Sequence, residues 1–335
     1  MNLDFFGPGE YPYKTILQKT ACESMAFDMK NLGYKAHAVH NNEATFYDRH
    51  KVFAQLGFDT FTPIEYMYDI ERNPTGWCKD KVLVGEIEKV LDSSIGSDFV
   101  YTISVQGHGK YPSFEYYCEQ IHEMDEFVGQ LINMLNTRME PTVLVLYGDH
   151  LPGFEWTAQE MENESLFQTK YVVWNNLNLP AIKRDVESYQ LAAHILNMLD
   201  IHEGTMIRFH QRHLDAHDTD TQGYLDAMKI LQYDILYGDH EVYGGESPYQ
   251  ATQLEFGVTP IIQGTTVHNT DQVIVFGGPF NSWSKICVNG KAADTQYYSK
   301  TRLIAKGVEP KEKEEITVQQ VGRDKIHLGT ARKKQ

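Results

Sequence analysis

The chain has 335 residues, of which 41% are apolar and 23% are charged, and its formal net charge is −16. This is the composition of a globular protein with a buried core, and the length suits about two domains. The charge excludes a surface that binds nucleic acid, and no apolar run approaches the ~20 residues that span a bilayer.

The N-terminus predicts a chain that begins partway through a domain. Residues 1–13 contain no charged segment followed by an apolar one, so they are not a signal peptide. A Gly7-Pro8-Gly9 turn instead precedes the first predicted element. The chain by itself is therefore expected to be soluble, without a signal or an anchor.

Predicted helices and strands alternate from residue 14 to about residue 200. Apolar stripes predict helices over 14–32, 49–56, 79–91, 114–135 and 188–199, and apolar or β-branched runs predict strands over 34–40, 58–61, 99–105, 142–147 and 171–174. The run 142–147, TVLVLY, is typical of a central parallel strand covered on both faces. The alternation predicts an α/β domain with a doubly wound sheet that has helices on both faces.

The pattern changes after residue 203. Residues 203–257 are mixed, with a helix near 223–231, and short alternating strands follow from residue 258. Asn289-Gly290 is a strong hairpin signal between two of these strands. We therefore expect a sheet domain over 1–257 and a small all-β, Ig-like sandwich module over 258–335.

Polar residues gather after three predicted strands. His40 is followed by Tyr47 and Arg49, Val105 by the loop that bears His108, and Tyr147 by Gly148-Asp149-His150. Ligands bind beyond the carboxyl ends of the strands in doubly wound sheets, so these three ends are expected to converge on one rim.

Asp149 and His150 form the clearest candidate metal site. A carboxylate oxygen and an imidazole nitrogen suit a divalent ion such as Mn²⁺ or Zn²⁺, and Gly148 would let the backbone turn both side chains to one point. A second Gly-Asp-His copy, 238–240, follows a helix-like stretch, and we interpret it as a polar turn.

His108 and the pair His40 and Arg49 are candidate contacts for an anion. A histidine between two glycines can bind an anionic oxygen or protonate a leaving group, and a guanidinium binds phosphate or sulfate oxygens. On local grounds an exposed loop histidine and a surface charge at a helix N-terminus are equally consistent with these residues.

The catalytic set is incomplete in this chain. Metal sites usually have three or more protein ligands, and only two are evident here. No Ser, Thr or Cys stands beside a base as a nucleophile, and the chain has neither a G-x-S-x-G elbow nor a Gly-rich phosphate loop.

At these residues the chain resembles the lipoteichoic acid synthase-like branch of the sulfatase and alkaline-phosphatase superfamily. The resemblance covers roughly residues 1–256. It rests on FFGPGEYPYKT (5–15), LGYKAHAVHNN (32–42), FYDR (46–49), LGFDTF (56–61), SVQGHGKYP (104–112) and YGDHLPG (147–153).

The resemblance implies an extracytoplasmic, membrane-tethered enzyme. Such enzymes transfer phosphoglycerol or cleave phosphate or sulfate esters through a threonine intermediate at a Mn²⁺ site. It implies that Asp149 and His150 are metal ligands, and that His108, His40, Arg49 and Tyr47 contact an anionic lipid head group or a polyglycerolphosphate-type substrate. The threonine and an acidic ligand precede the matched segment in the family, so no catalytic residue is assigned.

Three functional hypotheses follow. The first is an impaired metal-dependent enzyme of this family. The second is a non-catalytic remnant that binds an anionic head group or a glycan. The third is a structural, wall-associated protein in which the sheet domain is a scaffold.

Overall fold

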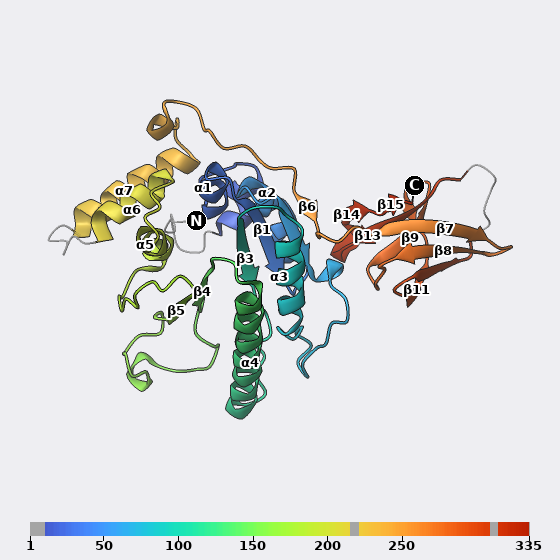
Figure 1. Cartoon of the computed structure of the whole chain (residues 1–335), viewed down its shortest axis with the longest axis horizontal. Helices are drawn as coiled ribbons and strands as arrows, with labels where there is room; N and C mark the ends of the chain where they lie inside the picture. The colour runs from blue at the N-terminus through green and yellow to red at the C-terminus, as the bar shows by residue number, and fades with distance from the viewer. Residues whose placement is uncertain (1–10, 215–220, 309–313, 335) are drawn as a thin grey trace. The chain divides into compact units, whose positions relative to one another are not determined.

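The computed structural model of the chain describes residues 11–214, 221–308 and 314–334. They divide between two compact units, each described here by itself: the first comprises Met1–Ile70, Gly85–Ile103 and Glu187–Gln335, and the second Glu71–Val84 and Ser104–Val186. The α-helices are α1 (Met25–Asn31), α2 (Arg49–Gln55), α3 (Val82–Asp92), α4 (Phe114–Arg138), α5 (Leu191–Met198), α6 (Thr205–Leu214) and α7 (Thr221–Leu236) (Figure 1). None of the helices in these described ranges is long and apolar enough to cross a membrane.

A four-stranded parallel sheet organises the first unit. Its order is β3 (Asp98–Ile103), β1 (Lys35–His40), β2 (Thr60–Pro63) and β6 (Glu255–Phe256). Ala26 of α1 and Val52 and Phe53 of α2 share one apolar cluster with Ala36 and Ala38 of β1. The expected α/β fold with helices packed on a parallel sheet is therefore confirmed.

The first predicted helix is much shorter than expected. Two 3-10 turns, η1 (Pro12–Lys14) and η2 (Ile16–Gln18), precede it, and α1 begins only after Ser24, whose Oγ accepts a hydrogen bond from the Phe27 N–H at 3.4 Å. Ser24 is a good N-cap, and it starts the helix inside a stretch whose apolar spacing suggested one continuous helix.

The C-terminal part of the first unit is all-β, as expected. One sheet has the order β10-β9-β13-β14 and the other β11-β12-β8-β7-β15. Val275, Leu303, Ile286 and Val318, which come from both sheets, lie in one buried cluster. The strands are β7 (Ile262–His268), β8 (Gln272–Gly278), β9 (Ser284–Val288), β10 (Lys291–Ala292), β11 (Thr295–Ser299), β12 (Arg302–Lys306), β13 (Ile316–Val321), β14 (His327–Thr330) and β15 (Arg332–Lys333).

The hairpin expected at Asn289-Gly290 is present. It joins β9 to β10, which pair antiparallel, and Asn289 and Gly290 have φ angles of 50° and 79°. Two successive residues with positive φ match the type I′ turn that this dipeptide favours.

The second unit corrects the prediction for residues 142–147. β4 (Val143–Tyr147) pairs antiparallel with β5 (Tyr171–Asn175) in a separate two-stranded sheet, and its residues are half-buried or exposed. The expectation of a central parallel strand covered on both faces is wrong, and so is the expectation that its end belongs to the same sheet rim as β1 and β3. An apolar run cannot distinguish an antiparallel pair from a buried parallel strand, because the partner strand is remote in sequence.

Candidate functional site

His40 ends β1 and is held on both sides of its ring. Its side chain is buried, Nδ1 donates to the Ile103 carbonyl at 2.8 Å, and Nε2 accepts from Arg49 Nη1 at 3.2 Å. Burial, together with the charge of Arg49, lowers the pKa of His40 to about 3. His40 is therefore neutral, and it orients Arg49 instead of acting as a cation.

Arg49 lies beside two aromatic rings at the start of α2. Its guanidinium carbon is 5.4 Å from the Phe46 ring centre and 5.5 Å from the Tyr47 ring centre, and Nη1 also donates to the Phe46 carbonyl. Tyr47 and Asp48 have φ angles of 54° and 55°, and this left-handed pair turns the chain back so that Arg49 reaches His40. The structure thus places His40 and Tyr47 against the guanidinium of Arg49, an arrangement suited to an anion.

His108 lies in the second unit, in the loop between β3 and α4. The ring centres of Trp77 and His108 are 4.9 Å apart, and Trp77 Nε1 donates to the Gly109 carbonyl at 2.9 Å. The His150 ring centre is 6.3 Å from that of His108, at an interplanar angle of 83°. The structure therefore brings His108 and His150 together.

Asp149 and His150 follow β4 and are exposed. Asp149 Oδ1 is 3.8 Å from His150 Nε2, and His150 Nδ1 donates to the Leu151 carbonyl at 2.7 Å. With the proton on Nδ1, Nε2 is the nitrogen with a lone pair for a cation. Gly148 has no positive φ, and a Cβ there would meet Thr169 only at an ordinary 3.4 Å, so the turning role expected of Gly148 is wrong.

The donor set suits a divalent cation but is incomplete. Asp149 and His150 supply one carboxylate and one imidazole, the donors that Mn²⁺ and Zn²⁺ accept. Over residues 11–214, 221–308 and 314–334 no group of three or more His, Cys, Asp and Glu side chains could hold a metal ion. These two residues fit as part of a ligand set, and no reaction step is derived through the ion.

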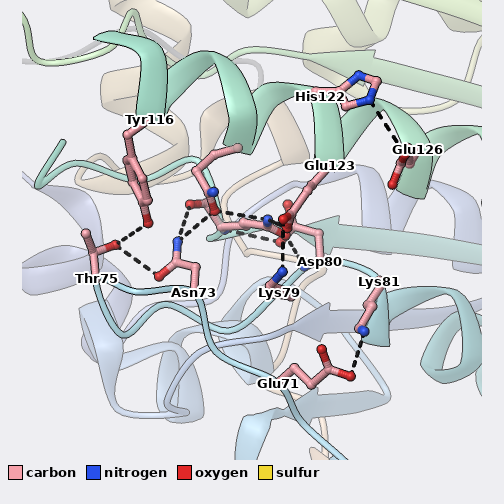
Figure 2. A network of polar contacts seen from close by, with 12 residues as sticks. Glu71, Asn73, Thr75, Lys79, Asp80, Lys81, Tyr116, His122, Glu123 and Glu126 are labelled. Carbon is pink, nitrogen blue, oxygen red and sulfur yellow. Dashed lines mark hydrogen bonds and ion pairs between the residues drawn. The ribbon is translucent and has the colours of Figure 1, made fainter. Parts of the chain in front are cut away.

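A buried polar network, which the sequence did not reveal, holds the loop that bears His108 (Figure 2). Asp80 Oδ1 accepts from the backbone N–H groups of Val105 and Gln106, both at 3.2 Å, and the Asp80 N–H donates to Gln106 Oε1 at 2.7 Å. Gln106 Nε2 also donates to Glu123 Oε2, and Glu123 pairs with Lys79 at 2.9 Å.

Asn73 extends the network toward Trp77. Its Nδ2 donates to the Gln106 carbonyl and to Gln120 Oε1, while its Oδ1 accepts from the Trp77 N–H at 2.9 Å. The buried side chain of Asn73 thus fixes the backbone of Gln106, two residues before His108, and the backbone of Trp77, whose ring contacts His108. Reading polar residues only at strand ends missed these partners, because they come from the segment before α3 and from α4.

An aromatic cluster adjoins the same loops. The Phe154 ring centre lies 5.0 Å from that of Tyr111, 5.8 Å from Phe114 and 4.9 Å from Trp156. Tyr111 also donates from its hydroxyl to the Gly107 carbonyl at 2.8 Å, and Phe114 is 52% exposed. The members come from the loop after His108, from the first turn of α4 and from the loop after His150, so only the fold gathers them.

The comparisons with known proteins agree with this fold. The sulfatase family model matches residues 2–201. The chain is a member of the sulfatase family. The expected membership of the sulfatase and alkaline-phosphatase superfamily is thereby confirmed, and members of this superfamily generally depend on divalent metal ions.

Two curated relatives come from Rhizobium meliloti (strain 1021). A protein named for cyclic beta-1,2-glucan modification is 25% identical over 228 residues, which are 56% of this chain and 35% of that protein. Capsular polysaccharide biosynthesis protein RkpI is 28% identical over 138 residues, which are 37% of this chain and 25% of that protein. This sulfatase-family chain thus spans about a third or less of the length of either relative.

A solved structure with the same fold is the Streptococcus pyogenes phosphoglycerol transferase GacH in complex with sn-glycerol-1-phosphate. It superposes with a TM-score of 0.58 at 20% identity and covers 74% of each chain. This likeness shows that the sulfatase-family chain has an alkaline-phosphatase-like α/β fold.

Proposed function

We propose that this chain carries the metal-binding and head-group-binding parts of an envelope enzyme that transfers phosphoglycerol or cleaves a phosphate or sulfate ester. The proposal rests on the pair Asp149 and His150, which lies beside His108. The ring centres of His108 and His150 are 6.3 Å apart. A cation-donor pair next to a histidine that can bind an oxyanion suits a phosphate ester.

The divalent ion is inferred to be Mn²⁺. His150 Nε2 and the Asp149 carboxylate are the donors, since His150 Nδ1 already donates to the Leu151 carbonyl. When bound, the ion would neutralise charge on the ester oxygens. His108, held by Trp77, would bind an ester oxygen or supply a proton to a leaving group.

Arg49 is the inferred contact for an anionic head group. It is oriented by His40 and lies beside the rings of Phe46 and Tyr47, a setting that favours a planar cation over a flexible lysine. GacH was solved with sn-glycerol-1-phosphate, which makes this small molecule a suitable probe.

The second substrate is inferred to be a saccharide of the cell envelope, on the extracytoplasmic side. The rings of Tyr111, Phe114, Phe154 and Trp156 offer partly exposed apolar faces next to the His108 loop. Sugar C–H faces can pack on such rings, whose faces carry partial negative charge. Both curated relatives are named for polysaccharide chemistry, which supports the same substrate class.

The polypeptide itself is inferred to turn over esters slowly. Its described residues supply two metal donors, fewer than the three protein ligands of ordinary catalytic sites. The alternative function, binding of an anionic head group or a glycan without catalysis, is favoured by this same deficit.

The first test compares the two Gly-Asp-His copies in the full chain. Mn²⁺ at 100 times its Kd should stabilise the native protein by about 2.7 kcal/mol, and this shift in thermal unfolding should disappear in Asp149→Ala. Asp239→Ala is the matched control, because Asp239 is also exposed and also precedes a histidine. An equal Mn²⁺ effect in both variants would exclude Asp149 as a ligand.

The second test measures turnover of bis(p-nitrophenyl) phosphate with Mn²⁺. We expect no Mn²⁺-dependent rate above background for the 335-residue chain. A robust rate that Asp149→Ala abolishes would contradict slow turnover while supporting the metal site.

A further inference from the structure

The all-β module contacts the segment that follows β2. This segment, η4 (Ile64–Tyr66), presents the backbone carbonyl of Glu65 to two buried side chains of the module. Asn281 Nδ2 donates to this carbonyl at 2.8 Å, and Gln320 Nε2 donates to it as well. Gln320 Nε2 also donates to Asn281 Oδ1 at 2.8 Å, so the two amides act as one unit.

The side chain of Glu65 reaches the loop that carries Arg49. Both of its carboxylate oxygens accept from the Ala44 N–H, at 3.2 and 3.1 Å, and both residues are fully buried. The Ile64 N–H donates to the Asn42 carbonyl at 3.1 Å. Asn42 and Ala44 lie between His40 and Arg49, so η4 fixes the chain that connects those two residues.

Two further features show that the module and η4 are closely fitted. A Cβ at Gly329 would come within 2.5 Å of the Tyr66 hydroxyl, and one at Gly322 within 3.1 Å of Glu65 Oε1. Arg323 Nη1 pairs with Glu43 Oε2 at 3.1 Å at the surface of the same contact. The module therefore approaches both η4 and the loop between His40 and Arg49.

We propose that the C-terminal all-β module is part of the head-group site, in which Asn281 and Gln320 fix Glu65, and Glu65 fixes the loop that presents Arg49. The module is then a positioning element, and it does not need a ligand of its own. This inference rests on the proposed function for the role of Arg49, but the positioning itself can be measured without any ligand.

A substitution in the module is expected to loosen the loop between His40 and Arg49, because the polar groups at the contact between the module and η4 are buried. Truncating a buried hydrogen-bond partner leaves the other group unsatisfied. Local opening of the loop should therefore become about tenfold more frequent. Burial raises the pKa of Glu65 to about 7, so about half of the Glu65 carboxyls are protonated at neutral pH. Glutamine is therefore a conservative replacement, since its carbonyl can still accept from Ala44.

Hydrogen exchange of the full chain without ligand tests the positioning. In Gln320→Ala and in Asn281→Ala, peptides covering residues 41–49 should exchange about tenfold faster than in the wild type. Gln263→Ala is the matched control, because Gln263 is a buried glutamine whose bonds to Ile316 and Val318 stay inside the module. Unchanged exchange of 41–49 in Gln320→Ala, or an equal increase in Gln263→Ala, would overturn the proposal.

Arg323→Ala keeps the proposal testable if the buried variants fail to fold. Arg323 is exposed, and its removal breaks only the ion pair to Glu43, so a smaller increase of exchange in the same peptides is expected. Exchange of 41–49 unchanged in this variant would count against the proposal.

Binding of sn-glycerol-1-phosphate supplies the second readout. Glu65→Ala should weaken binding about tenfold, and Glu65→Gln should restore it to within a factor of about two. Equal loss in both variants would indicate general destabilisation and would overturn the positioning role. If the wild-type chain does not bind this probe, the proposed function fails, whereas the exchange of 41–49 still decides whether the module positions the loop.

Discussion

His40 and Arg49 show how a partner decides the role of a residue. The sequence predicts both as direct contacts for an anion. In the structure both ring nitrogens of His40 are occupied, one by the Ile103 carbonyl and one by Arg49. A neutral histidine that accepts from a guanidinium fixes the direction of that cation, so Arg49 and not His40 would supply the charge for the proposed anion.

Asp28 is a buried carboxyl whose titration opposes folding. It is fully buried in α1, and within the described residues neither of its oxygens has a hydrogen-bond partner. Burial, with a smaller contribution from Glu23, raises the pKa of Asp28 to about 9. The unfolded chain loses this proton near pH 4 and the folded chain only near pH 9. The free energy of unfolding should therefore fall as pH rises from about 4 to about 9.

Asp28→Asn should remove this part of the pH dependence and stabilise the protein by about 2 kcal/mol at pH 8. Chemical denaturation at pH 5 and pH 8 provides the measurement. Asp239→Asn, at an exposed position, makes the same change of charge and should leave the slope unaltered. A variant Asp28→Asn with the wild-type slope would show that Asp28 is ionised in the native state.

At the scale of elements, the segment before α3 determines the loop after β3. Asp80 accepts from two consecutive backbone N–H groups, at Val105 and Gln106, and thereby fixes the chain two residues before His108. A buried carboxylate with backbone donors orients a loop more strongly than a neutral acceptor does.

Asp80→Ala should therefore lower the free energy of unfolding by about 1–3 kcal/mol, because it leaves buried N–H groups without their acceptor. Asp80→Asn keeps one acceptor oxygen and should cost less. Glu71→Ala is the control, since it breaks only the exposed ion pair with Lys81, whose effect should stay below about 1 kcal/mol. Equal stability of Asp80→Ala and Glu71→Ala in urea denaturation would contradict a structural role for Asp80.

At the scale of the whole molecule, the sheet and the all-β module share one buried core. Phe61 of β2, Tyr66 of η4 and Ile286 and Leu328 of the module belong to a single apolar cluster. The compact unit that contains the parallel sheet also includes the module, so this division places no boundary at residue 257. A domain boundary at that residue stays a prediction. Because the net charge is −16, the proposed anionic substrate would have to be bound through local cations such as Arg49.

Removal of residues 258–335 should therefore destabilise what remains. It exposes Tyr66 and leaves the Glu65 carbonyl without the amides of Asn281 and Gln320, so the midpoint of thermal unfolding should fall by several degrees. Calorimetry of the shortened and full chains measures this. An unchanged midpoint would mean that the module folds and acts independently.

The sequence by itself determined most helices and strands, the hairpin at Asn289-Gly290 and the family motifs, because apolar spacing and turn residues act over a few neighbouring positions. Only the tertiary structure decided that β4 pairs antiparallel with β5, that His40 supports Arg49, and that Asp80 and Glu65 hold the loops of the candidate site. These pairings join residues far apart in the chain, and burial makes each one specific because an unsatisfied polar group is costly away from water. A linear pattern records which side chains are available, whereas their partners are set by the packing of the whole fold.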